Sequence, residues 1–207
     1  MRRTIMIALA IPMLWACGSE PRTVGQANGS ANKADNKARV VESAVAETSI
    51  AAEAPDDRSR FTSIDPTRCR LLEENIEEGG WWRRLCQGSA DYKLELSESD
   101  LRQDIVVMEE GGRRSELGLS ELVANGAFNA LGKTAEWRGK DPARPDALIV
   151  RLGVASDPEG KKPDISNLVV ARLKPSACVV AVVPPGPGQN ERARAIADGK
   201  LPACLKR

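Results

Sequence analysis

Hydrophobic and polar residues alternate along two segments of the chain, residues 92–96 and 148–154. In the first, Tyr92, Leu94 and Leu96 are separated by charged residues, and in the second, Leu148, Val150, Leu152 and Val154 are separated by Ile149, Arg151 and Gly153. A period of two places successive side chains on opposite faces of a strand, so both segments are predicted strands with one buried face. Leu101–Met108, which follows the turn-like segment Ser97–Asp100, is a third predicted strand.

Two apolar runs near the C-terminus predict a hairpin followed by a helix. Leu168–Leu173 and Cys178–Val183 are separated by a short loop that contains a proline. The Pro- and Gly-rich residues 184–188 cannot continue the second strand, and Asn190 is the predicted N-cap of a helix that stops at Asp198–Gly199. One face of this helix, which we expect to pack on the hairpin, carries Ala193, Ile196 and Ala197.

An acidic, glycine-ended segment, residues 73–80, predicts a second hairpin between Cys69–Leu72 and Trp81–Cys86. The predicted register sets Cys69 opposite Cys86 and Glu73 opposite Trp82, with the loop over Ile76–Gly79.

A further helix or irregular segment is expected within Leu117–Leu131, where Leu119, Leu122 and Val123 can share a face. These elements predict an α+β fold, with a mainly antiparallel sheet and a short C-terminal helix, preceded by a disordered tether.

The N-terminus has the pattern of a secretory signal. Met1-Arg2-Arg3 precedes a largely apolar run from Ile5, too short to span a bilayer, and the run ends in Leu14-Trp15-Ala16-Cys17. This ending resembles the lipobox of bacterial lipoproteins. The resemblance implies that residues 1–16 are a signal peptide and that Cys17 is acylated and becomes the mature N-terminus. An ordinary secretory or anchoring signal is the alternative.

Composition then divides the rest of the chain into a lipidated, flexible linker, residues 17–59, and a single domain, residues 60–207. The linker is rich in Ala, Ser, Asn, Glu and Lys and has no aromatic residue, so it cannot bury enough apolar surface to fold. The implied location is the cell envelope, lipid-anchored and facing the periplasm. Gly18 rather than aspartate after Cys17 favours the outer membrane under the sorting pattern of familiar lipoproteins.

Charge and cysteine usage narrow the functional classes. The chain has 30 Lys and Arg, 29 Asp and Glu, and no histidine, and their scattered distribution argues against nucleic-acid binding. If Cys17 carries lipid, four of the five cysteines remain for disulfides: Cys69, Cys86, Cys178 and Cys204. Four cysteines can pair in three ways, and we favour Cys69–Cys86 and Cys178–Cys204 because each pair brackets a local unit. Without histidine or a C-x-x-C motif, neither a metal site nor a catalytic cysteine is expected.

Short motifs along residues 61–205 resemble those of bacterial envelope proteins whose activity is unknown. The motifs are Trp82–Cys86, Asp100–Arg102, Glu136–Arg138, Ala147–Arg151 and Ala195–Asp198. This resemblance implies one extracytoplasmic domain with a core of short strands and two cysteine pairs. It implies no chemistry.

The cluster Trp81-Trp82-Arg83-Arg84 is the main candidate for a partner surface, in a chain with only 3% aromatic residues. Alternation along a strand predicts one buried and one exposed indole, with an arginine on each face for cation–π stacking. An exposed indole would suit a glycan or an envelope protein. The structural alternative is one tryptophan in the core and one covered by a neighbouring segment. Core packing is also the expectation for Trp137.

Acidic residues are the main candidates for catalysis. Glu73, Glu74, Glu77 and Glu78 could supply an acid and a base for glycoside cleavage. They could also supply oxygen ligands for calcium, but their spacing does not match a calcium loop, and a solvated turn is the structural alternative. Serine with lysine as its base remains open for a hydrolase. No S-x-x-K or G-x-S-x-G motif occurs within residues 60–207. We therefore favour a non-enzymatic binding or accessory module without cofactor or metal, anchored to the membrane through Cys17. The alternative is a small hydrolase of envelope polysaccharide or peptide that uses carboxylates.

Overall fold

The computed structural model describes residues 57–77, 79–141 and 143–206, which fall within one compact unit. The predicted signal peptide of residues 1–16, Cys17 and the predicted linker up to residue 56 lie outside the described residues. No helix among the described residues is both long and apolar enough to cross a lipid bilayer.

The described residues form two antiparallel sheets of five strands each, and the predicted α+β fold with a mainly antiparallel sheet is confirmed. Sheet A has the order β1 (Ser59–Ser63), β7 (Asn129–Arg138), β8 (Ala147–Val154), β9 (Ile165–Arg172) and β10 (Cys178–Val183). Sheet B has the order β2 (Arg70–Asn75), β3 (Trp81–Gln87), β4 (Tyr92–Ser99), β5 (Arg102–Glu109) and β6 (Arg114–Glu116). Three short helical segments complete the fold: the 3₁₀ turn η1 (Pro66–Arg68), α1 (Leu119–Leu122) and α2 (Gln189–Asp198).

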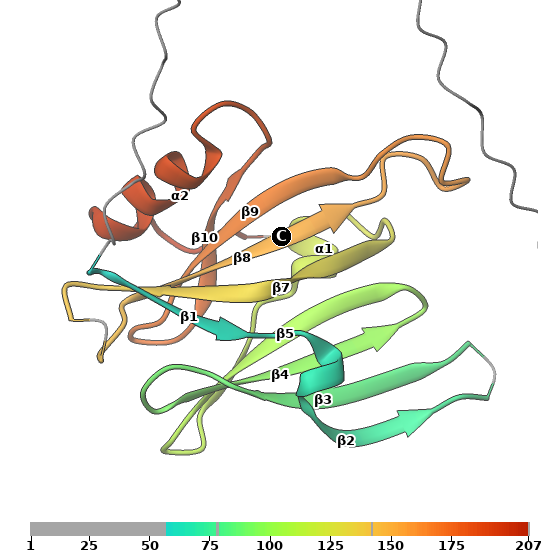
Figure 1. Cartoon of the computed structure of the whole chain (residues 1–207), viewed down its shortest axis with the longest axis horizontal. Coiled ribbons are helices and arrows are strands. Elements are labelled where there is room, and N and C mark those ends of the chain that lie inside the picture. The colour runs from blue at the N-terminus through green and yellow to red at the C-terminus, as the bar shows by residue number, and fades with distance from the viewer. Residues whose placement is uncertain (1–56, 78, 142, 207) are drawn as a thin grey trace, which may run out of the picture. The chain divides into compact units, whose positions relative to one another are not determined.

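The two sheets face each other, and α2 packs on the other side of sheet A (Figure 1). The core between the sheets contains Leu94 and Leu96 from β4 and Leu148 and Val150 from β8, as alternation predicts. Ile149, on the opposite face of β8, is buried as well, so the expectation of one buried face is wrong for this strand. The reason is α2, which covers the outer face of sheet A and creates a second, smaller core there.

Trp137 belongs to the main core and is fully buried, as the sequence predicts. Its ring stacks on Tyr92 with 5.8 Å between centroids, and its indole N–H donates a 2.8 Å hydrogen bond to the Thr62 hydroxyl. The backbone of Gly88 lies against this ring, so a Cβ at position 88 would be only 2.9 Å from it. Thr62 belongs to sheet A, Tyr92 belongs to sheet B, and Gly88 lies in the turn after β3. Trp137 therefore links the two layers.

The C-terminal hairpin and helix form as predicted, apart from the helix cap. β9 and β10 pair antiparallel, and Ala193 and Ala197 of α2 are buried against the outer face of sheet A. The N-cap is Gly188, with φ +64°, and not Asn190. Gln189 explains the earlier start, because its amide donates to the carbonyls of Ser166 and Val183 and so fixes the first helical residue.

Both disulfides in the structure are the pairs that the sequence analysis favours. Cys69 and Cys86 have Cα atoms 4.5 Å apart, and Cys178 and Cys204 have Cα atoms 5.7 Å apart. The C-terminal tail runs back beside β10, where the N–H of Leu205 donates to the Val179 carbonyl.

The β2–β3 hairpin departs from its predicted register halfway along. Leu71 lies opposite Arg84, which fits the predicted pairing, but a bulge between Leu71 and Glu73 then shifts the strand by one residue. Glu73 therefore lies opposite Arg83 instead of Trp82, and the loop spans residues 76–80 instead of ending at residue 79.

The segment around α1 is mostly not helical. Asp104 accepts hydrogen bonds from the N–H groups of Leu119 and Ser120 and so holds the start of the helix. Gly126, with φ +79°, follows soon after, and β7 begins at Asn129. Of the helix or irregular segment expected within residues 117–131, only a single helical turn forms, and the residues between it and β7 are irregular.

Candidate partner-binding surface

The four residues of the Trp-Arg cluster divide between the two faces of β3. Trp82 packs against the core between the sheets, and the Arg84 guanidinium lies 5.7 Å from the centre of its ring. Trp81 and Arg83 lie on the outer face of sheet B. Both indoles are half-buried, which differs from the predicted buried and exposed pair. Trp82 keeps part of its ring accessible because it lies at the end of the sandwich, next to an open hollow.

This hollow of about 500 Å³ lies at the tips of the β2–β3 and β4–β5 hairpins. We call its main lining residues the hairpin-tip surface: Glu74, Ile76, Trp81, Trp82, Glu98, Asp100 and Leu101. Ile76 is 89% exposed and Leu101 is 61% exposed. Two aliphatic side chains on neighbouring hairpin tips thus extend into solvent beside two tryptophans.

Leu101 occupies a backbone conformation that a leucine disfavours. Ser99 and Arg102 are paired, so Asp100 and Leu101 form a two-residue turn, with φ +49° and +57° respectively. Such turns favour Asn-Gly or Asp-Gly, and an L-residue other than glycine in the left-handed region costs about 1–2 kcal/mol. Neither the turn nor the core benefits from leucine at this position. The predicted strand Leu101–Met108 therefore begins one residue later, at Arg102, and Leu101 is presented to solvent.

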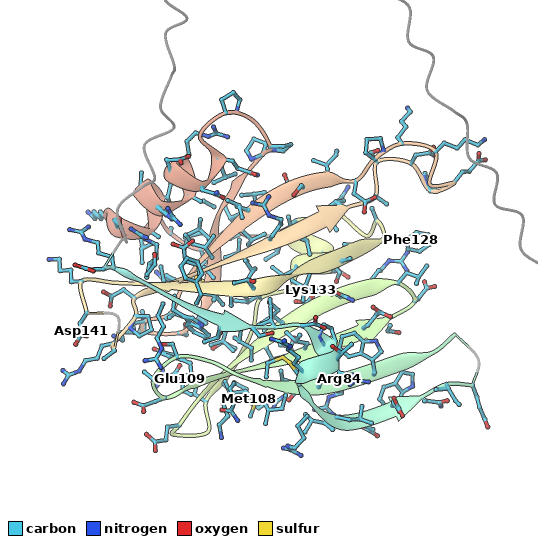
Figure 2. All side chains as sticks on the ribbon, viewed as in Figure 1. Arg84, Met108, Glu109, Phe128, Lys133 and Asp141 are labelled. Atoms are coloured by element: carbon cyan, nitrogen blue, oxygen red, sulfur yellow. A yellow bond between two sulfur atoms is a disulfide. The ribbon has the colours of Figure 1, made fainter. Side chains whose placement is uncertain are left out.

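A second, smaller hollow of about 180 Å³ lies at the same end of the molecule. Its apolar lining includes Phe128 and Pro158, and the Arg102 guanidinium lies 4.9 Å from the centre of the Phe128 ring. The N–H of Asn129 donates to the Leu101 carbonyl, which joins this region to the β4–β5 turn. Figure 2 labels Phe128 at the end of the sandwich where β7 begins. Sequence reasoning singled out the tryptophans but missed Ile76, Leu101 and Phe128.

The acidic residues of the β2–β3 hairpin do not gather into one site. Glu73 pairs with Arg83 at 3.3 Å, and Glu74 lies 3.9 Å from Arg84. Glu77 is exposed, and the side chain of Glu78 lies outside the described residues. Glu74 and Glu98 lie on either side of Trp82, each opposite it on a neighbouring strand. Within the described part of the chain, no group of three or more acidic or cysteine side chains is arranged to hold a metal ion.

A buried carboxylate lies on the outer face of sheet B, where the sequence suggests only a solvent-facing charge. Glu95 accepts hydrogen bonds from Arg83 Nε at 2.8 Å and Nη2 at 2.7 Å, and Arg114 Nη1 lies 2.9 Å from its other oxygen. Burial raises the pKa of Glu95, but the hydrogen bonds and charges of Arg114 and Arg83 outweigh burial and lower the pKa below its ordinary value. This cluster ties β3, β4 and β6 together.

Replacing Glu95 with glutamine should lower the free energy of unfolding by about 1–2 kcal/mol at pH 7, because two arginines lose their shared carboxylate. The pKa of Glu95 is lower in the folded state, so its contribution is fully present above the unfolded value of about 4.3 and is lost as the pH falls further. Urea unfolding should therefore show a difference between the two proteins that shrinks below about pH 4. Glu110→Gln, in the exposed β5–β6 turn, is the control. An equal Glu95→Gln effect at pH 7 and pH 3 would show that the charge is not responsible.

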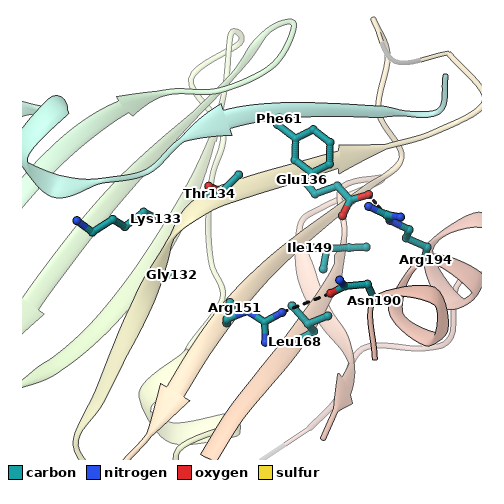
Figure 3. A pocket seen from close by; sticks show the side chains of 10 residues that line it. All are labelled: Phe61, Gly132, Lys133, Thr134, Glu136, Ile149, Arg151, Leu168, Asn190 and Arg194. Atoms are coloured by element: carbon teal, nitrogen blue, oxygen red, sulfur yellow. Dashed lines mark hydrogen bonds and ion pairs between the residues drawn. The ribbon is translucent and has the colours of Figure 1, made fainter. Parts of the chain in front are cut away.

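A further hollow, of about 250 Å³, lies between the outer face of sheet A and α2 (Figure 3). Phe61, Ile149 and Leu168 form its apolar part. Arg151 donates to Ser166, Gln189 and Asn190, and Glu136 accepts from Ser59 and Arg194. Among the lining residues, Arg151 with Asn190 and Glu136 with Arg194 connect the sheet to the helix. We interpret it as the structural junction that holds α2 in place.

The hairpin-tip surface therefore combines exposed aliphatic residues, two indoles and an unfavourable turn residue in one place. Glu74 and Glu98, the carboxylates beside Trp82, already have protein partners: Glu74 faces Arg84, and Glu98 accepts a 2.5 Å hydrogen bond from the Gln103 amide. No family model, curated protein or solved structure matches this chain, so the geometry of its own residues is the basis for a function.

Proposed function

We propose that this protein is a lipid-anchored, non-enzymatic binding module of the bacterial cell envelope. In this proposal Cys17 carries the lipid, the folded domain lies on the periplasmic side, and the outer membrane is favoured over the inner membrane. The N-terminal pattern resembling a lipobox supports the anchor. The hairpin-tip surface supports the binding role, and its partner is an envelope protein or a glycan and not a nucleic acid.

The observation that carries the binding role is the position of Leu101. Its left-handed backbone opposes folding, and its largely exposed side chain gains little from folding that could offset this cost, whereas glycine would adopt the same turn without strain. Residues held in disfavoured conformations cluster at functional sites, where the contact that they make offsets the strain. Ile76, at the tip of the neighbouring β2–β3 hairpin, is also an exposed aliphatic residue. A partner that buries both side chains accounts for their presence.

A hydrolase is the competing function, and it would use Glu74 and Glu98. Glycosidases hold an acid and a base on opposite sides of the scissile bond. Here both carboxylates project from the same sheet face on either side of Trp82 and already have protein partners. Binding is therefore the function that this geometry favours.

Leu101→Gly should separate stability from function. The substitution relieves the left-handed strain and should raise the free energy of unfolding by about 1 kcal/mol. Ala90→Gly is the matched control, because Ala90 also has a positive φ, +53°, and lies in the β3–β4 turn at the other end of sheet B. Both variants should become more stable in urea unfolding, but only Leu101→Gly should lose partner binding. Equal partner binding by the two variants would contradict a role for Leu101.

The partner can be sought by photo-crosslinking in the bacterium that produces the protein. A photoreactive residue at Ile76 should give a discrete adduct in the membrane fraction, which Leu101→Gly abolishes. Ser176, in the exposed β9–β10 loop, is the control position and should give no such adduct. Identical adducts from both positions, or none from Ile76, would overturn the proposed surface.

The anchor has its own test. Intact-mass analysis of the protein from the membrane fraction should show a chain that begins at Cys17 with added acyl mass. A chain that retains Met1, recovered from the cytosol, would overturn the proposed location. These two experiments are independent, so the anchor and the binding surface can fail separately.

A further inference from the structure

We infer that the hairpin-tip surface selects a cationic protein segment, in which lysine or arginine side chains flank an apolar residue that inserts beside Trp82 and Leu101. This inference rests on the proposed binding function and adds the chemistry of the partner. The hairpin-tip surface carries negative charge as well as apolar residues, and an apolar partner alone would leave that charge without a role.

Carboxylates are the only charged groups that line the hollow among the described residues. Glu74, Glu98 and Asp100 contribute to it, and no lysine or arginine does. Glu77 adds a fourth carboxylate close by, in the exposed loop of the β2–β3 hairpin. Glu98 has a neutral partner, the Gln103 amide, and no described cation pairs with it.

The two nearest arginines are already occupied by contacts within the protein. Arg84 lies over the Trp82 ring, donates to the Pro66 carbonyl and faces Glu74. Arg102 binds Asp100 and the Gly126 carbonyl and lies over Phe128. Neither arginine lines the hollow, and Glu98 has no cationic partner among the described residues, so the lining keeps a net negative charge.

Charge complementarity distinguishes between the occupants that an apolar hollow could take. A second copy of the chain bound by the same surface would bring like charges together, and an anionic lipid surface would be repelled. A neutral glycan would stack on the indoles but would leave the carboxylates without a role. A segment with both positive and apolar side chains satisfies both features. Partial exclusion of water at the contact would strengthen the attraction.

The test uses the full-length, detergent-solubilised protein and two fluorescent peptides. In one peptide lysines alternate with leucines, and in the other glutamines replace the lysines. Fluorescence anisotropy should give a Kd for the lysine peptide at least about tenfold lower than for the glutamine peptide, a difference that shrinks as salt is added. Glu98→Gln should weaken binding of the lysine peptide about three- to tenfold and leave binding of the glutamine peptide unchanged.

Glu110→Gln removes the same charge from the opposite end of sheet B and should leave both Kd values unchanged. Leu101→Gly should weaken binding of both peptides, because each carries leucine. If Leu101→Gly weakens both peptides but Glu98→Gln weakens neither, the inferred charge selection is wrong and the binding surface stands. If the lysine peptide does not bind, or binds equally well to Glu98→Gln, Leu101→Gly and wild-type protein, the inference is overturned. The crosslinks from Ile76 then decide the proposed function separately.

Discussion

Replacing Trp137 with alanine should lower the free energy of unfolding by about 3–5 kcal/mol, the largest loss expected from one substitution in this fold. The side chain is completely buried, stacks on Tyr92 and donates its indole N–H to Thr62. Alanine would remove all of these contacts and leave a cavity between the sheets. Because the backbone at Gly88 already lies against the ring, neighbouring residues would have little freedom to fill the space. Chemical unfolding monitored by circular dichroism measures the loss.

Trp137→Phe is the control for this prediction. Phenylalanine retains an aromatic ring in the core but removes the hydrogen bond to Thr62, so the loss should be smaller, about 1–3 kcal/mol. Trp82→Phe, at the open end of the sandwich, should cost less again. A loss below about 1 kcal/mol for Trp137→Ala would show that this residue does not link the sheets.

Arg138→Met should lower the free energy of unfolding by about 3 kcal/mol, because it breaks a buried ion-pair network. The Arg138 side chain is 2% exposed, and its Nε and Nη2 bind the two oxygens of Asp198 at 2.9 Å and 2.6 Å. Nη1 contacts Glu136 at 3.1 Å and also binds Ser59. Arg138 therefore joins the end of β7 to the end of α2 and to β1. Methionine fills much of the volume, but Asp198 loses the nearer of its two arginine partners and Glu136 loses one of its own.

Arg194→Met is the matched control, because Arg194 binds the same Glu136 oxygen at 2.9 Å but is more exposed. Its loss should be less than half that of Arg138→Met in urea unfolding. Limited proteolysis gives a second readout, since a loosened α2 should be cleaved faster in Arg138→Met. Equal stability of the wild type and Arg138→Met, with equal rates of cleavage, would show that apolar packing alone holds α2.

The alternation of side chains predicted most of the fold because most strands have one covered face. In β4 the alternation predicted the core residues Tyr92, Leu94 and Leu96, but the strand continues to Ser99, through residues that the sequence predicts as a turn. β8 differs, because α2 buries Ile149 on the outer face of sheet A. The pattern within β8 cannot predict this burial, since α2 lies about forty residues later in the chain. Pairing along β2 and β3 was predictable up to the bulge after Leu71. A bulge depends on how the strand bends against its neighbours, which the sequence of one hairpin does not encode.

The candidate surface was predicted only where its residues are conspicuous. Two adjacent tryptophans in a chain with few aromatic residues attract notice, but an isolated Ile76 or Leu101 does not. The sequence predicts the turn over Ser97–Asp100, but the pairing of Ser99 with Arg102 places it at Asp100 and Leu101. Glu95 alternates with leucines like any solvent-facing residue. Its burial depends on Arg83 and Arg114, which approach from two other strands.

Strand β7 separates the end of the fold where β1 begins from the end that carries the hairpin tips. The Arg58 carbonyl, just before β1, accepts from the N–H of Gly139 after the last residue of β7, whereas the Leu101 carbonyl accepts from Asn129 at its first. The ten residues of β7, at about 3.3 Å each, place these ends about 30 Å apart (Figure 1). If Cys17 carries an acyl chain, as proposed, the linker joins the domain at the end opposite the hairpin tips. A partner could then reach the hairpin-tip surface without meeting the segment that attaches the domain to the membrane.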